Sequence, residues 1–344
     1  MSMSNKKWFC MAAAAALLLT ACAKRPDSSS GSSSGTMGSS NVTSTSQSTS
    51  GAWRTGLGIL TETTDQDRTG KINTIAAAVL LDGEGKLAHV QLDELEVNIS
   101  ADGNGAVTMP TDYRTKRQKG DDYPLAAASS LKKGWDEQAD AFADYLTGMT
   151  PEQAAKLETD PDGRAKDADL LSGCTIAVDR YRDAVAKACE NAEALGAAKG
   201  DELALGVEAS NGSSSLTATD DRDVNAQLDI TVVALTKDSD GRVTSAVGDM
   251  TEPALTVSAD GGVSAPDEVR SKREQGDEYG MRQASSLGKE WYEHSEGFCS
   301  YLKGKTAQEI NAIPDDGSDA DLAALCTISV DDLQKAAGKA LEDR

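Results

Sequence analysis

Histidine and cysteine are scarce in this chain of 344 residues, which contains two histidines and six cysteines. So few histidines disfavour histidine-based metal sites and catalytic triads, and no nucleophile with a histidine base stands out, which argues against a hydrolase. Six cysteines are too few for a disulfide scaffold at this length, and no C-x-x-C pair occurs. The chemistry of the chain must therefore come from other residue types.

The chain also lacks apolar runs long enough to span a membrane, and its longest apolar stretch lies at the N-terminus. Lys6 and Lys7 precede an apolar stretch from Trp8 to Leu19, which is too short to cross a bilayer as a mature helix. The stretch ends in Leu-Thr-Ala-Cys, which resembles the lipobox of bacterial lipoproteins. That resemblance implies that Cys22 is diacylated, becomes the mature N-terminus and anchors the protein to the extracytoplasmic face of a cell membrane. The alternative is an ordinary signal peptide with an incidental Cys22.

Acidic residues outnumber basic ones, 56 to 34, which gives a formal net charge of −22. Such acidity argues against nucleic acid as a partner and against flat adsorption on anionic lipid. We interpret it as a means of keeping the protein soluble at a crowded surface. Residues 27–51 are almost wholly Ser, Thr, Gly, Asn and Gln, a composition typical of a flexible tether with a reach of about 25–30 Å. We therefore predict a lipoprotein signal peptide over residues 1–22 and a tether over residues 23–51.

The rest of the chain is a duplication. Residues 115–131 (TKRQKGDDYPLAAASSL) and 271–287 (SKREQGDEYGMRQASSL) are identical at nine of seventeen positions, at a constant offset of 156. After a four-residue deletion in the second copy, the match resumes as DADLLSGCT over 167–175 and DADLAALCT over 319–327. A period this long indicates whole domains, so we predict two tandem homologous repeats over residues 52–198 and 199–344.

Each repeat reads as strands followed by helices. We expect strands over 72–81 and 86–100, and again over 227–236 and 242–247, with D-G-E-G-K and D-S-D-G-R as hairpin turns. Apolar residues at helical spacing predict helices over 131–146 and 287–302, with Trp135 and Phe142 in the core. Short helices should begin at Thr150 and Thr306, and last helices near 179 and 331. This order predicts an α+β fold, a small mainly antiparallel sheet packed with helices in each repeat.

One motif points to a cofactor. The segment from Asp169 to Thr175, D-L-L-S-G-C-T, resembles the D-x-x-S-G-A-T motif of the FMN-binding domain family. The resemblance implies that a flavin transferase attaches FMN covalently through its phosphate to Thr175, with Asp169, Ser172 and Gly173 forming the rest of the site. It also implies a redox partner, so that the protein would carry electrons. A glycine that lets backbone approach a phosphate, followed by a helix N-terminus, is physically consistent with such a site.

The two copies differ at this motif. Cys174 replaces the family's alanine in the first copy, and Ala324-Leu325 replaces Ser-Gly in the second, although Cys326 and Thr327 remain. Retention of the threonine without Ser-Gly indicates a structural role for it in both copies. The alternative hypothesis is therefore a non-catalytic binding or structural lipoprotein on the same scaffold, and an electron carrier or binding protein is favoured over an enzyme in either case.

Three further features remain, and the first two have two interpretations each. Lys116 and Arg117, which recur as K-R in the second copy, are candidates for clasping the FMN phosphate, or else belong to a helix-entry loop. The acidic run over 315–321 is a candidate calcium loop, or else a solvated turn without calcium-loop spacing. Cys189 and Cys299 align with Leu341 and Ala143 and are interpreted as small core residues.

Overall fold

The computed structural model describes residues 51–212, 217–314 and 316–342. The signal peptide, Cys22 and the tether up to residue 50 lie outside this part, so the predictions about them stay predictions. Both repeats belong to one compact unit, Ser48–Arg344. Among the described residues, no helix has the length and apolar character needed to cross a membrane.

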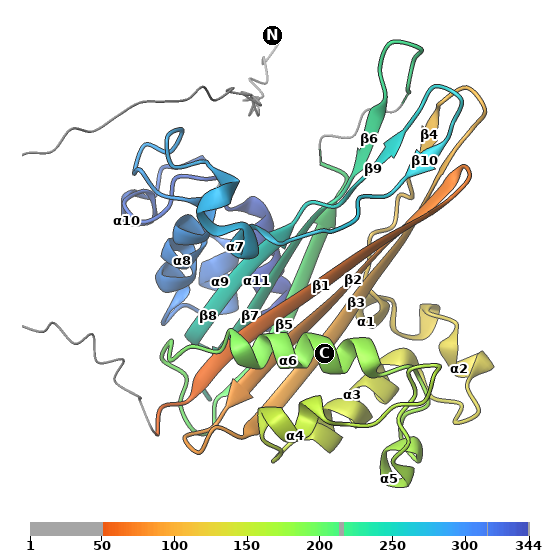
Figure 1. The fold of residues 1–344 in the computed structure, drawn as a ribbon. Helices are drawn as coiled ribbons and strands as arrows, with labels where there is room; N and C mark the ends of the chain where they lie inside the picture. The colour runs from red at the N-terminus through yellow and green to blue at the C-terminus, as the bar shows by residue number, and fades with distance from the viewer. Residues whose placement is uncertain (1–50, 213–216, 315, 343–344) are drawn as a thin grey trace, which may run out of the picture. The chain divides into compact units, whose positions relative to one another are not determined.

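The first repeat places a twisted antiparallel sheet before its helices, as predicted (Figure 1). The sheet has the order β1-β2-β3-β4, with strands β1 (Arg54–Gln66), β2 (Thr69–Leu81), β3 (Leu87–Ala101) and β4 (Val107–Thr108). The helices are α1 (Lys116–Lys119), the 3-10 turn η1 (Gly120–Asp122), α2 (Leu125–Ala128), α3 (Trp135–Leu146), α4 (Pro151–Ala155), α5 (Ala168–Leu171) and α6 (Asp179–Glu190).

The second repeat follows the same plan with its strands divided between two sheets. One has the order β5-β7-β8, from β5 (Glu202–Ser210), β7 (Asp229–Lys237) and β8 (Val243–Thr251), and the other β10-β9-β6, from β6 (Val224–Gln227), β9 (Ala254–Val257) and β10 (Val263–Ser264). The helices are α7 (Lys272–Gln275), η2 (Gly276–Tyr279), α8 (Trp291–Leu302), α9 (Ala307–Asn311), α10 (Ala320–Ala323) and α11 (Asp331–Leu341). The α+β prediction is confirmed.

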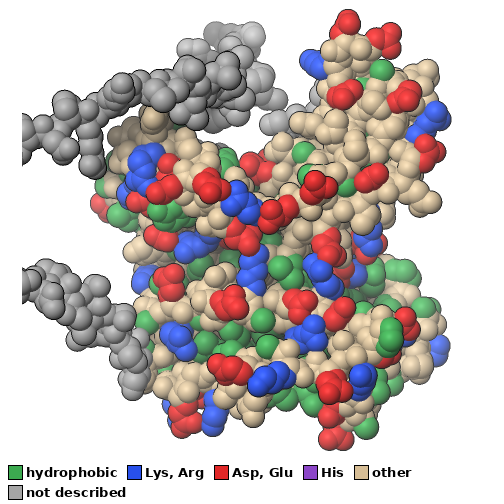
Figure 2. All heavy atoms as spheres, viewed as in Figure 1, with side chains coloured by type: hydrophobic (Ala, Val, Ile, Leu, Met, Phe, Trp, Pro, Cys, Tyr) green, Lys and Arg blue, Asp and Glu red, His purple; other side chains and the backbone are tan. Residues whose placement is uncertain are grey.

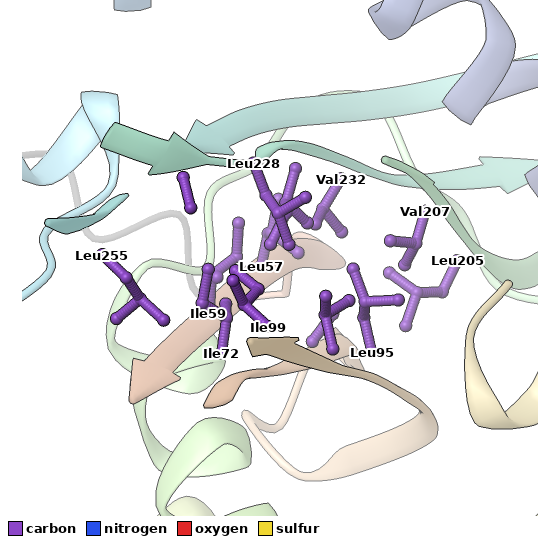
Figure 3. Close-up of a cluster of buried hydrophobic side chains, with 14 of the residues drawn as sticks. Leu57, Ile59, Ile72, Leu95, Ile99, Leu205, Val207, Leu228, Val232 and Leu255 are labelled. Atoms are coloured by element: carbon purple, nitrogen blue, oxygen red, sulfur yellow. The ribbon is translucent and has the colours of Figure 1, made fainter. Parts of the chain in front are cut away.

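The inner faces of the two main sheets pack against each other. Leu57 of β1 lies across the core from Val232 of β7, and Leu95 of β3 lies near Leu205 and Val207 of β5 (Figure 3). The two repeats therefore share one apolar core, in addition to the core that each builds beneath its own helices. This explains why residues 75–81 of β2 are buried on both faces and form an unbroken apolar run.

Helices cover the outer face of each sheet (Figure 1). Helices α3 and α6 pack on β1–β3, and α8 and α11 pack on β5, β7 and β8. Trp135 and Phe142 are buried in the first of these helical cores, as predicted, and Cys189 and Cys299 are also core residues. On the face seen in Figure 2, acidic and basic side chains are interspersed.

Glycine sets the distance between helix and sheet at equivalent places in the two repeats. A Cβ built on Gly58 of β1 would lie 2.3 Å from the carbonyl oxygen of Ala184 in α6. A Cβ on Gly206 of β5 would lie 1.9 Å from the carbonyl oxygen of Ala336 in α11. Only glycine allows the backbones to approach this closely.

Candidate functional site

The motif that resembles a flavinylation site lies on α5 and the turn after it. Asp167 caps α5 by accepting from the backbone N–H of Asp169 at 2.9 Å, and the exposed Ser172 donates its hydroxyl to the Asp169 carbonyl at 2.7 Å. A Cβ on Gly173 would lie 3.1 Å from the Cβ of Ala141 in α3, so the turn sits directly on that helix. Cys174 is buried, and desolvation raises the pKa of its thiol to about 11, so the thiol is neutral.

Thr175 is held by a side chain of α3. Its backbone N–H and its hydroxyl both donate to Oε1 of Gln138, at 2.9 and 3.1 Å. The Gln138 amide is fully buried and donates in turn to the hydroxyl of Ser129 at 3.1 Å and to the carbonyl of Lys133 at 3.0 Å. The hydroxyl that the family resemblance would modify therefore already has a partner within the fold.

The second repeat builds the same linkage with a different side chain. His294 occupies the position of Gln138, and its Nδ1 accepts the backbone N–H of Thr327 at 3.2 Å. Its Nε2 lies 2.8 Å from the hydroxyl of Ser285, the counterpart of Ser129. In both copies, one buried side chain thus joins the loop before the long helix to the turn that contains the threonine.

The Ser285–His294 pair does not have the polarity of a catalytic dyad. Because Nδ1 accepts an N–H, neutral His294 carries its proton on Nε2 and donates it to the serine oxygen. A histidine in this state does not withdraw a proton from the serine. The pair therefore does not supply the nucleophile and base that a hydrolase needs.

Lys116 and Arg117 are engaged by carboxylates of the same repeat. The ammonium of the nearly buried Lys116 lies 2.7 Å from Oε2 of Glu94. Arg117 donates to the Leu92 carbonyl at 3.0 Å and to Asp140 at 2.7 Å. Among the residues the structure describes, no hydrogen bond or ion pair joins either cation to residues 169–175. The two parts of the predicted phosphate site, the Lys116–Arg117 pair and residues 169–175, therefore each contact α3 but do not contact each other through these bonds.

A buried polar network surrounds Lys116, and most of its members are not apparent from the sequence. Glu94 also accepts from the hydroxyl of Tyr181 in α6, and that hydroxyl accepts from Nε1 of Trp135 at 2.9 Å. All four side chains are at least nine-tenths buried. Burial and the neighbouring carboxylate raise the pKa of Tyr181 well above its ordinary value, so it stays a neutral donor.

The second repeat lacks this network but keeps its lysine paired. Met250 and Leu333 stand where the first repeat has Glu94 and Tyr181, so both polar partners are replaced together by apolar residues. Lys272, the counterpart of Lys116, instead pairs with Glu252 at 2.9 Å. The short helix that begins with this lysine, α1 in one copy and α7 in the other, is thus anchored by an ion pair in each.

A second pair of carboxylates fixes the start of each of these two helices. Asp93 accepts from the hydroxyl of Thr115 at 2.8 Å and from the backbone N–H of Arg117 at 3.3 Å. Asp249, which lies 156 residues later, accepts from the backbone N–H of Arg273 at 3.0 Å. Comparing the two copies at the offset of 156 would have revealed this pair.

The acidic run over 315–321 serves local structure in the part that is described, from residue 316 onward. Asp319 caps α10 by accepting from the backbone N–H of Leu322 at 2.9 Å, and it also accepts from the hydroxyl of Tyr301. Asp316 accepts from the backbone N–H of Ser318 at 2.9 Å. These contacts lower the pKa values of both carboxylates and keep them ionised.

Comparison with known proteins identifies no relative: no family model, no curated protein and no solved structure matches this chain.

Proposed function

We propose that this protein is an extracytoplasmic lipoprotein, anchored through Cys22, whose two-repeat body is a non-catalytic binding or structural module. One observation carries the second half of the proposal. In both copies the backbone N–H of the retained threonine donates to a buried side chain of the long helix, Gln138 in one and His294 in the other, and the hydroxyl of Thr175 donates to Gln138 as well. The turn that contains this threonine is thus fixed to the long helix in the same way in both copies, which supports a structural role for it that needs no cofactor.

A second candidate is an electron carrier with FMN joined through its phosphate to Thr175, made by a flavin transferase and served by a redox partner. The exposure of Ser172 and the partial exposure of Thr175 favour access to this turn. The residues present fit the group poorly. The Thr175 hydroxyl is engaged by Gln138, and Asp179 places a carboxylate in the first turn of α6, which opposes a phosphate at that helix end. Lys116 and Arg117 are committed to carboxylates elsewhere.

The membrane anchor is tested by replacing the cysteine that would carry it. We expect the full chain, expressed in a bacterium that processes lipoproteins, to partition into detergent-extractable membranes, and Cys22→Ala to be released from them. Stable anchoring takes more than one acyl chain, and Cys22→Ala removes the residue that would carry them. The loss of membrane binding should therefore be nearly complete. The measurement is the membrane-bound fraction, together with the mass of the mature N-terminal peptide.

Cys10→Ala is the matched control, because Cys10 lies in the predicted signal peptide but outside the Leu-Thr-Ala-Cys segment. It should leave both the membrane fraction and the acylated peptide unchanged. A mature N-terminus that carries no acyl group, in wild-type protein, would contradict the anchor while leaving the proposed role of the body open.

A further inference from the structure

Position 138 of the first repeat and position 294 of the second do the same structural work with different chemistry. Gln138 and His294 are both fully buried in the long helix, and each joins a serine before the helix to the threonine turn. A glutamine amide keeps one charge state at every pH of interest. An imidazole does not, because its ordinary pKa lies near neutrality.

Protonation is incompatible with the bond that His294 makes at Nδ1. The backbone N–H of Thr327 points at that nitrogen with an N···N distance of 3.2 Å. A protonated imidazole carries N–H groups on both nitrogens, so an N–H would then face another N–H. The turn must move away from the ring, or the ring from the turn, before His294 can hold a second proton.

The segments on either side of the ring depend on this linkage. The Ser285 hydroxyl, which His294 holds at Nε2, accepts the backbone N–H groups of Leu287 and Lys289 at 3.2 and 3.3 Å. The ammonium of Lys289 donates to the carbonyl of Leu325 at 2.8 Å and so joins the loop to the turn. Leu287 and Leu325 are large apolar residues with 39% and 37% of their surface exposed.

We propose that the Ser285–His294–Thr327 linkage is a pH-sensitive latch, which holds loop 281–289 and turn 324–328 on α8 when His294 is neutral and releases them when it is protonated. The corresponding linkage of the first repeat, built on Gln138, stays closed. Acidification therefore loosens one end of the second repeat only, at the site that carries the two exposed leucines. The inference goes beyond the proposed function and does not require that a flavin be present or absent.

The charges around His294 set the pH at which the latch opens. Burial lowers the pKa of the imidazole and Lys289 lowers it further, while Glu293 and Glu290 of the α8 start oppose them. On the side of the turn, Cys326 has its pKa raised to about 11 by burial and is neutral. Because the pKa of His294 is lower in the folded protein than in the unfolded chain, the latch has its full stability above about pH 6.5, the unfolded value. It weakens as the pH falls from there toward the folded pKa.

The test compares amide hydrogen exchange in the full chain and in His294→Gln, which copies the first repeat. Protection is measured at Leu287, Lys289 and Thr327 between pH 7.5 and pH 5, after correction for the intrinsic rate. For wild-type protein we expect the equilibrium constant for opening to rise by up to about tenfold for each unit by which the pH falls across the titration, as linkage of one proton requires. His294→Gln should keep its protection throughout. In both proteins, so should Thr175 and Leu131, whose N–H donates to the hydroxyl of Ser129 at 3.2 Å.

Gln138→His provides the reciprocal variant if His294→Gln does not fold. It should confer acid-dependent exchange on Leu131 and Thr175, which wild-type protein lacks. The chain has only one other histidine, the exposed His89, so the imidazole resonances report directly on the state of His294. The proposal is overturned if exchange at Leu287, Lys289 and Thr327 in wild-type protein does not change with pH while His294 titrates. It is also overturned if His294→Gln retains the wild-type pH dependence.

Discussion

We expect Glu94→Ala to lower the free energy of unfolding by about 3–5 kcal/mol, the usual cost of removing one partner from a buried ion pair. The substitution removes the nearer carboxylate of Lys116, leaving only Glu96 at 3.7 Å, and it leaves the hydroxyl of Tyr181 without its acceptor in a region that excludes water. Urea unfolding measures the change as a shift of the midpoint at constant slope.

The second repeat supplies the control for this prediction. The double variant Glu94→Met with Tyr181→Leu reproduces the apolar pair Met250 and Leu333, and Lys116 can then move to Glu96, whose Oε2 lies 3.7 Å away. We expect the double variant to be less destabilised than the sum of the two single variants, by about 0.5–3 kcal/mol of coupling. Strict additivity would contradict the network, as would a cost below about 1 kcal/mol for Glu94→Ala.

The second large effect is expected at the glycines beneath the outer helices. Gly58→Ala places a methyl group 2.3 Å from the Ala184 carbonyl oxygen and 2.7 Å from the Ala188 nitrogen, both of them backbone atoms that a rotamer change cannot move. Helix α6 must therefore separate from β1, and we expect a loss of about 3 kcal/mol, at the upper end of overpacking costs. The measurement is again the urea midpoint.

Gly103→Ala is the matched control for Gly58→Ala. The added methyl group there meets only the guanidinium of Arg68, the end of a flexible side chain, at 3.1 Å and beyond. We expect a change within about 0.5 kcal/mol, as for most surface substitutions. Equal costs at the two positions would show that α6 does not pack on β1 as described.

The strands that sequence pattern predicts are those with apolar runs next to clear turns. The predicted strands 72–81 and 86–100 correspond to β2 and β3, and D-G-E-G-K forms the turn between them. Strands β1 and β5 were missed, because Gly56 and Gly58 interrupt the alternation in one and Gly206 does so in the other. Those glycines are required by helix packing, which is a tertiary effect that no local pattern contains.

The shared core between the repeats could not be derived from either repeat alone. An apolar strand face has the same sequence pattern whether a helix or a second sheet covers it. The buried acids were hidden for a related reason: Asp93 and Glu94 lie in a D-E-L-E run that resembles a solvated strand face. Their burial arises only when α1 and α6 pack over β3.

The histidine was visible in the sequence, but its role was not. His294 has no histidine counterpart in the first repeat, so the comparison of the copies by identity leaves it without a role. Its actual counterpart is Gln138, and the equivalence of an amide and an imidazole becomes clear only from their shared serine and threonine partners. Comparing copies by hydrogen-bonding capacity, as well as by identity, would have found this pair.

The central claim is that Thr175 serves the fold and does not carry a flavin. The most direct measurement is the intact mass of the full chain after co-expression with an active flavin transferase, with a known substrate of that transferase expressed in parallel and Thr175→Val as the matched variant. We predict that the known substrate gains FMN while wild-type protein and Thr175→Val both show only their unmodified polypeptide mass and no in-gel flavin fluorescence. An FMN adduct on the wild-type chain that survives denaturation and is absent from Thr175→Val would contradict the claim.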